Sequence, residues 1–175
     1  MKTKLLLTIS LLAGILLCGC GDKKAGEENL TPPAGMRYLD ISRTGMNLYV
    51  LTPDDKAGIL DTVMQSWGGY EIKVGKEFQI SVEEGAGDIE MVKSDNAGND
   101  VNKLKRYLVD EPTTLVWESG VADLSEFHFY HIIKIGSRSF VIQDIKGEPF
   151  SQKAIEKMLD AAKQTKEVKK GEASA

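Results

Sequence analysis

The chain begins with a short apolar leader that ends at a cysteine, and this feature limits which residues remain to form the fold. Lys2 and Lys4 precede an apolar run over residues 5–17, and Cys20 follows shortly after. The run has about 13 residues, whereas a helix that crosses a membrane needs about 20, so a permanent transmembrane anchor is the weaker interpretation. A basic start, a short apolar core and small residues before a cleavage point are typical of a secretory signal peptide. We therefore expect residues 1–19 to be removed.

The residues around this cleavage point resemble the lipobox of bacterial lipoprotein precursors. That motif has Leu, a small residue, Gly or Ala, and then the Cys that becomes lipidated and N-terminal. Leu17, Gly19 and Cys20 match it, and Cys18 is an unusual occupant of the second position. The resemblance implies that Cys20 is the lipidation site, because acylation at Cys18 would put the bulky Leu17 directly before the cut.

Lipidation at Cys20 would attach the mature chain to a membrane. One acyl chain, at about 0.8 kcal/mol per buried CH₂, holds a protein only reversibly, whereas two or more hold it firmly. Lipoproteins of this kind carry several chains. Gly21 follows the cysteine, and in enterobacterial lipoproteins a Gly at this place does not signal retention in the inner membrane. The resemblance therefore implies a lipid-anchored protein of the cell envelope, at the outer membrane or the cell surface.

The cysteine count and the charge exclude several classes of function. Cys18 leaves with the leader and Cys20 is acylated, and the chain has no other cysteine. The mature domain therefore has no disulfide, no cysteine nucleophile and no thiolate zinc site. The net charge of -4 becomes more negative once Lys2 and Lys4 are removed, and no basic cluster stands out in the interior. Nucleic acid is therefore not expected as a partner.

Composition divides the mature chain into three parts. Residues 20–35 are small and charged, end in Pro32-Pro33-Ala34-Gly35, and lack an apolar period, so they predict a flexible linker after the lipidated cysteine. Residues 166–175 lose their apolar side chains and predict a disordered tail. Residues 36–165 remain as one domain, long enough to bury a core without disulfides or metal.

Within the domain, the clearest pattern is at the C-terminal end. Ser151 is a good N-cap, and apolar residues recur at helical spacing after it, which predicts a helix from Gln152 to Thr165. Two hairpins are also predicted, over residues 70–82 with a turn at Gly75-Lys76 and over residues 127–145 with a turn at Gly136-Ser137.

The other elements are predicted from weaker patterns. Short strands are expected over residues 89–92 and 114–117. A helix capped by Asp100 and ended by Pro112 is expected between them. Residues 53–67 have helically spaced apolar residues after Pro53 and predict a helix, with an irregular loop as the alternative.

This order predicts an α+β domain, a mostly antiparallel sheet packed by helices that include a C-terminal one. Its closing hairpin and helix resemble the PsbP-like fold of several exported proteins and, less well, the type III secretion chaperone fold. The resemblance covers topology from about Leu39 to Lys163 and does not carry a function.

No residue pattern indicates catalysis. His128 and His131 lie three apart in a predicted strand, so they point to opposite faces and do not share a metal ion. Residues 95–100 are rich in oxygen ligands but break the EF-hand spacing, and a turn explains them better. The carboxylates of residues 83–90 surround two glycines and predict a solvated turn. Most aromatic residues are expected in the core. The alternative is that a pocket for an apolar ligand is lined by aromatic residues, namely Trp67, Trp117, Tyr107, Tyr130, Phe129 and Phe140.

The sequence therefore predicts a non-catalytic envelope lipoprotein that binds a protein partner or aids assembly of an envelope complex. The alternative is a carrier of a small molecule or lipid, with a cavity between the sheet and the C-terminal helix. No cofactor and no metal are expected, and Cys20 is the one functional site that the sequence names.

A Cys20→Ser substitution tests the anchor. It removes the sulfur that would be acylated, so we expect fatty-acid labelling and membrane retention to be lost in cells, whereas Cys18→Ser should keep both. Labelling and retention that survive Cys20→Ser would contradict the assignment.

Overall fold

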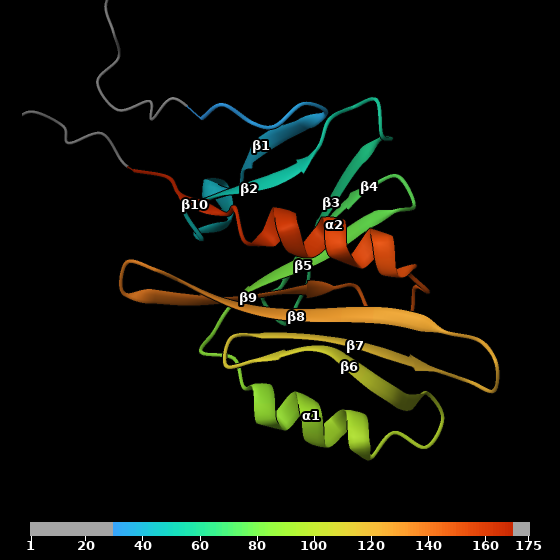
Figure 1. Cartoon of the computed structure of the whole chain (residues 1–175). Helices are drawn as coiled ribbons and strands as arrows, with labels where there is room; N and C mark the ends of the chain where they lie inside the picture. The colour runs from blue at the N-terminus through green and yellow to red at the C-terminus, as the bar shows by residue number, and fades with distance from the viewer. Residues whose placement is uncertain (1–29, 170–175) are drawn as a thin grey trace, which may run out of the picture.

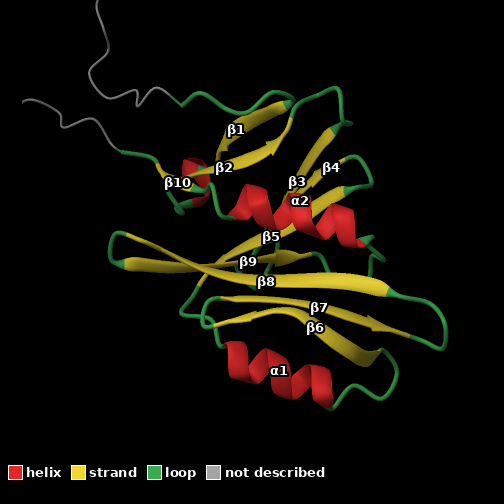
Figure 2. Cartoon of the chain, in the orientation of Figure 1, coloured by secondary structure: helices red, strands yellow, loops and turns green. Residues whose placement is uncertain are grey.

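The computed structural model describes residues 30–169, which form two antiparallel sheets and two helices (Figure 1; Figure 2). In chain order the elements are β1 (Met36–Asp40), the short 3₁₀ helix η1 (Ser42–Thr44), β2 (Leu48–Pro53), β3 (Leu60–Met64), β4 (Tyr70–Val74), β5 (Phe78–Glu84), α1 (Ile89–Ala97), β6 (Lys103–Glu111), β7 (Thr114–Gly120), β8 (Glu126–Ile135), β9 (Arg138–Asp144), α2 (Gln152–Ala162) and β10 (Lys166–Glu167). The α+β class is confirmed.

The larger sheet has seven antiparallel strands in the order β3-β4-β5-β9-β8-β7-β6, and the smaller one has the order β1-β2-β10. Both predicted hairpins are present, as β4–β5 and as β8–β9. The predicted strand over residues 114–117 is part of β7. The β8–β9 hairpin lies at the centre of the larger sheet, with β5 on one side and β7 on the other.

One face of the larger sheet, here called the α2 face, forms the main core with α2 and the smaller sheet (Figure 1). Ile72, Ile80 and Phe129 project from it and are fully buried. The Ser151 hydroxyl accepts a hydrogen bond from the Ala154 N–H (3.2 Å), so the predicted N-cap of α2 is confirmed. The helix ends at Ala162, a few residues before the predicted end.

The opposite face, here called the α1 face, is only partly covered. One row of paired residues crosses it in the order Glu71, Ser81, Gln143, Tyr130 and Leu115. Leu115 and Tyr130 form a second apolar cluster with α1. The part of the row on β4, β5 and β9 carries polar side chains instead, so the character of this face changes between β8 and β9.

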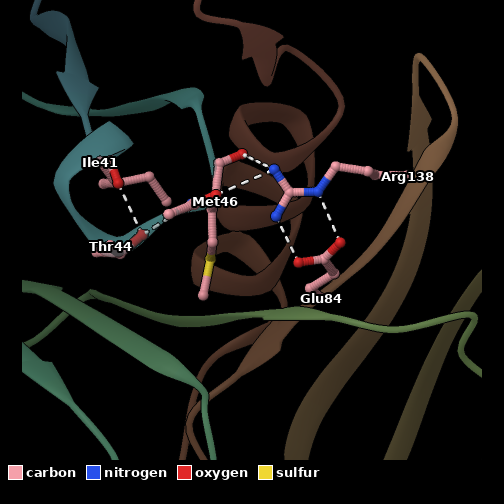
Figure 3. A network of polar contacts seen from close by, with 6 residues as sticks. Ile41, Thr44, Met46, Glu84 and Arg138 are labelled. Atoms are coloured by element: carbon pink, nitrogen blue, oxygen red, sulfur yellow. Dashed lines mark hydrogen bonds and ion pairs between the residues drawn. The ribbon is translucent and has the colours of Figure 1, made fainter.

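An arginine fork ties the β1–β2 connection to the larger sheet (Figure 3). Arg138 donates two hydrogen bonds to the Glu84 carboxylate, and its Nη1 donates to the carbonyl oxygens of Gly45 (3.0 Å) and Met46 (3.3 Å). The guanidinium group also lies over the Phe140 ring, 5.0 Å from the centroid. A planar group with five N–H donors suits this junction of two strands and a loop.

The helix predicted over residues 53–67 is wrong, because the segment is a turn followed by β3. Gly58 is the physical reason. A Cβ there would come within 2.6 Å of the Gly75 Cα, so the chain passes directly over the β4–β5 turn, with φ of +148° at Gly58. Thr62 and Val63 are also β-branched, which favours a strand.

Two adjacent predictions are wrong in opposite ways, because the predicted strand is a helix and the predicted helix is a strand. Residues 89–92, predicted as a strand, begin α1, whose N-cap is Asp88; its carboxylate accepts from the Met91 N–H (3.0 Å). The helix predicted after Asp100 is wrong, because the segment forms β6. Two register shifts in β6, near Leu104 and near Tyr107, interrupt the alternation of a strand, so its apolar residues fall three and four apart as they would on a helix.

The end of the domain also differs from the prediction. Lys166 and Glu167, assigned to the disordered tail from the sequence, pair with Tyr49 and Leu48 of β2 and form β10. The tail prediction is therefore wrong for these two residues. Among residues 30–169, no helix has the length and apolar character needed to cross a bilayer.

The packing of α2 generates a stability prediction. Ile155 has no exposed surface and lies in the main core. Ile155→Ala removes buried methyl groups and leaves a cavity, so the free energy of unfolding should fall by about 2–5 kcal/mol. Lys157→Ala on the exposed side of the same helix should change it by less than about 0.5 kcal/mol. Urea denaturation measures both, and equal losses would contradict the described packing.

Candidate functional site

Cys20, the site named by the sequence, lies outside the described residues, as do the leader and most of the linker. The described residues offer two surfaces with functional character. One is a pair of adjacent polar hollows on the α1 face, and the other is the free edge of β3.

The first hollow lies where the last turn of α1 meets the ends of β7 and β8. It has a volume of about 290 Å³ and is here called the His128 cleft. Its lining residues are Asp95, Asn96, Asn99, Asn102, Trp117, Ser119, Glu126, His128, Lys146 and Gly147. Two cross-strand pairs form its floor: Trp117 lies opposite His128, and Ser119 lies opposite Glu126. The Trp117 and His128 rings are stacked with centroids 5.1 Å apart.

Two carboxylates flank the imidazole of His128. Its Nδ1 donates to Asp144 Oδ2 (2.8 Å), and its Nε2 lies 3.7 Å from Glu126 Oε1. Asp144 is only 3% exposed, and its other oxygen accepts from the Phe129 N–H (2.7 Å). Burial by itself would lower the pKa of His128, but the hydrogen bond to Asp144 and the two negative charges outweigh it and raise the pKa. His128 is therefore a readily protonated group in the floor of the cleft, and its ring is fixed in orientation by Asp144.

Three side chains of this cleft have buried polar atoms without a hydrogen-bond partner. They are the Ser119 hydroxyl, Asn96 Nδ2 and Asn102 Oδ1. Ser119 is the most enclosed of them, with 3% of its surface exposed. Buried polar groups in proteins are nearly always hydrogen-bonded, so three unpartnered groups around one hollow make it a candidate site for a polar ligand.

A second hollow lies beside the first on the α1 face, and Lys146 lines both. It has a volume of about 350 Å³ and is here called the Trp67 cleft. Its lining residues are Trp67, Glu71, Ser81, Gln143, Asp144, Ile145 and Lys146. Trp67 belongs to the β3–β4 turn and is 53% exposed. The His128–Asp144 hydrogen bond joins the floors of the two clefts.

The second surface is the edge of the larger sheet formed by β3. Ile59, Val63 and Met64 lie in or beside this strand and are exposed, Ile59 to 87%. Among the described strands, β3 pairs only with β4. These three residues and the outer side of β3 are here called the β3 edge.

The other residues singled out from the sequence have structural roles. His128 and His131 do point to opposite faces, as predicted; His131 is buried against Thr114, whose hydroxyl lies 3.0 Å from its Nδ1. The predicted turn is present only after α1: residues 95–97 form the last turn of that helix, and the Asn99 side chain beyond it accepts from the N–H groups of Val101 and Asn102. Asp100 does not cap a helix, because β6 follows it.

The sequence named no residue of either cleft as a site. Trp67 and Trp117 belong to the aromatic set that the sequence offered as the lining of an apolar pocket, and each lines one cleft. Asn96 belongs to the oxygen-rich segment over residues 95–100, but Asn102 and Ser119 gave no sequence signal, because the three meet only after α1 folds over β7.

Comparisons with known proteins do not add a family. No protein family model matches the chain, and neither the curated proteins nor the solved structures include a similar one.

The two histidines should titrate in opposite directions. The Asp144 hydrogen bond raises the pKa of His128 above its ordinary 6.5, whereas burial and the charge of Lys163 lower the pKa of His131. Asp144→Asn should lower the pKa of His128 and leave that of His131 unchanged, as measured by NMR titration of the ring protons.

The pKa of His128 also fixes the sign of a stability effect. Because the pKa is raised in the folded state, the stability from this ion pair is fully present below pH 6.5 and is lost as the pH rises through the raised pKa. A His128 pKa at or below 6.5 in the native protein would contradict this account.

Proposed function

We propose that the protein is a lipid-anchored, non-catalytic component of the cell envelope that binds an extended segment of another envelope protein along the β3 edge. The observation that carries the proposal is that this edge lacks the features that usually prevent an edge strand from pairing with other strands. Anchorage through Cys20 is the part of the proposal that comes from the lipobox resemblance.

The two edges of the larger sheet differ in how they resist unwanted pairing. Soluble proteins usually protect edge strands with lysines, prolines, bulges or short length, because an open edge pairs readily with other strands. At the opposite edge, β6 has Lys103, Lys105 and Arg106 and two register shifts. Although β3 is shorter, with five residues against nine, it has no lysine, arginine or bulge, and Asp61 is its only charged residue. This contrast supports the β3 edge as a surface kept open for pairing.

The backbone of β3 presents free hydrogen-bonding groups to a partner. The Gly75 N–H donates to the Ile59 carbonyl and the Gln65 N–H donates to the Gly69 carbonyl, so the odd-numbered residues pair with β4. By the alternation of an antiparallel ladder, Leu60, Thr62 and Met64 turn their N–H and C=O groups outward. A segment that adds as a further strand would use these groups for affinity and the exposed apolar side chains for specificity.

Charge indicates the chemistry of the partner segment. Asp61 is exposed on β3, whereas in the turn before it Asp55 is exposed beside the oppositely charged Lys56, so Asp61 is the charge that a partner strand would face. We therefore expect an extended segment with apolar residues at alternate positions and a basic residue opposite Asp61.

The packing of α2 favours this function over a carrier with a cavity beneath the helix. Ile155, Met158 and Ala162 on the inner side of α2 have no exposed surface. A water-sized space next to these side chains would give them accessible area, so the interface has no room for a ligand beside them.

The PsbP-like or secretion-chaperone-like architecture remains part of this proposal. Its support is the order of the last elements, a hairpin of β8 and β9 followed by α2.

Crosslinking from the β3 edge tests the proposed function. With a photocrosslinking amino acid at Met64, irradiation of intact cells should give one discrete product with another envelope protein. The same amino acid at Val101, an apolar residue that is also exposed, should give no such product. Thr62→Pro should abolish the Met64 product, because the proline removes an outward N–H and leaves the pairing with β4 intact.

A second variant controls for the case in which Thr62→Pro fails to fold. Val63→Lys places a charge on the exposed strand and should also abolish the product, while Val101→Lys should not. A product that contains only two copies of this chain, or one that survives both β3 variants, would contradict the proposal.

A further inference from the structure

We propose that the His128 cleft and the Trp67 cleft together bind a neutral sugar chain, with one pyranose ring in each. This inference is independent of the β3 edge. It rests on unsatisfied hydrogen-bonding groups, the aromatic side chains, the charge of the lining and the adjacency of the two hollows.

The unpartnered atoms of the His128 cleft require a ligand that both donates and accepts. Asn96 Nδ2 is a donor, Asn102 Oδ1 is an acceptor, and the Ser119 hydroxyl is both. A sugar hydroxyl also donates and accepts, and a ring carries several of them at fixed spacing. Leaving such groups unpaired in a buried place costs free energy, so a ligand that satisfies them gains specificity.

The apolar surface of each cleft is nearly all aromatic. Trp117 lies in one cleft and Trp67 in the other, and Ile145 is the only aliphatic side chain among the described residues that line either. A lipid chain would need aliphatic walls, which are absent from this lining. A pyranose ring has one face of C–H groups that packs on an indole, while its hydroxyl groups reach the surrounding amides and carboxylates.

The charges of the lining disfavour an anionic ligand. Asp95 and Glu126 line the first cleft, and Glu71 and Asp144 line the second. Lys146 and His128 are the two basic side chains that line them, and His128 is already paired with Asp144. A neutral ligand avoids repulsion from the carboxylates and still uses them as hydrogen-bond acceptors.

The size and position of the clefts indicate more than one ring. Volumes of about 290 Å³ and 350 Å³ are at the small end for ligand sites, so each suits a ligand of about one ring. Lys146 lines both, so one chain of linked rings can occupy the two clefts at once. A disaccharide should therefore bind more tightly than its monosaccharide, because the second ring binds at high effective concentration.

Calorimetric titration of the purified full chain tests the site, in a detergent without a sugar headgroup. The probes are methyl glycosides of glucose, galactose, mannose and N-acetylglucosamine, their β-linked disaccharides, galacturonic acid as an anion and choline as a cation. We expect at least one neutral glycoside to bind, its disaccharide to bind more tightly, and both charged probes to fail. Ring-proton NMR should place the sugar beside His128.

Two variants separate the clefts. Ser119→Ala removes one hydroxyl and should weaken both glycoside and disaccharide about three- to tenfold. Because that hydroxyl has no partner in the free protein, the variant should not lose stability. Trp67→Ala should lower the affinity for the disaccharide to that of the monosaccharide and leave monosaccharide binding unchanged. Ser94→Ala, an exposed serine outside both clefts, is the matched control.

Several outcomes would overturn the proposal. They are a complete lack of binding by the neutral probes, binding of choline or galacturonic acid instead, and sugar affinity that Ser119→Ala leaves unchanged. Equal effects of Ser94→Ala and Ser119→Ala would also overturn it.

Discussion

The buried carboxylate of Asp144 holds the point where β8 and β9 separate. The pairing of these strands ends at Tyr130 and Gln143, so the Phe129 N–H has no partner in the β8–β9 ladder there. Asp144 Oδ1 accepts that N–H, and Oδ2 accepts from His128. A charge that is 3% exposed is tolerated only with such partners. The same contact fixes the His128 ring against Trp117, and the hollow of the His128 cleft follows from the separation of the two strands.

The two faces of the larger sheet contribute differently: one to the hydrophobic core and the other to the polar surface. On the α2 face, most central positions are apolar and buried, with His131 and Thr114 as buried polar exceptions, so this face carries most of the hydrophobic stabilisation. On the α1 face, the short helix covers Leu115 and Tyr130 and leaves the β4, β5 and β9 part to polar side chains. A domain stabilised from one side can keep open, polar hollows on the other without loss of its core.

The parts that the sequence predicted correctly are those with strong local signals. The Ser151 cap with its apolar period and the Gly136-Ser137 turn depend on residues close in sequence, and both are present. The errors arose where tertiary contacts, and not local sequence, determine the secondary structure. The close approach of Gly58 to Gly75 joins segments far apart, and the bulges of β6 hide its alternation. The clefts were not predictable for the same reason, because Asn96, Ser119 and His128 come from three elements that meet only in the folded chain.

An anchor on the N-terminal side, as the lipobox resemblance implies, would leave the His128 cleft away from the membrane. The smaller sheet carries the start of the described chain and, through β10, its end. It lies at the opposite end of the molecule from α1 (Figure 1). The Arg138 fork joins this sheet, through the β1–β2 connection, to β5 and β9 (Figure 3). A domain tethered through residues 20–35 would therefore keep the smaller sheet near its tether and leave the α1 end, with the His128 cleft, farther along the molecule. A large ligand would then reach the His128 cleft without release of the protein from the membrane.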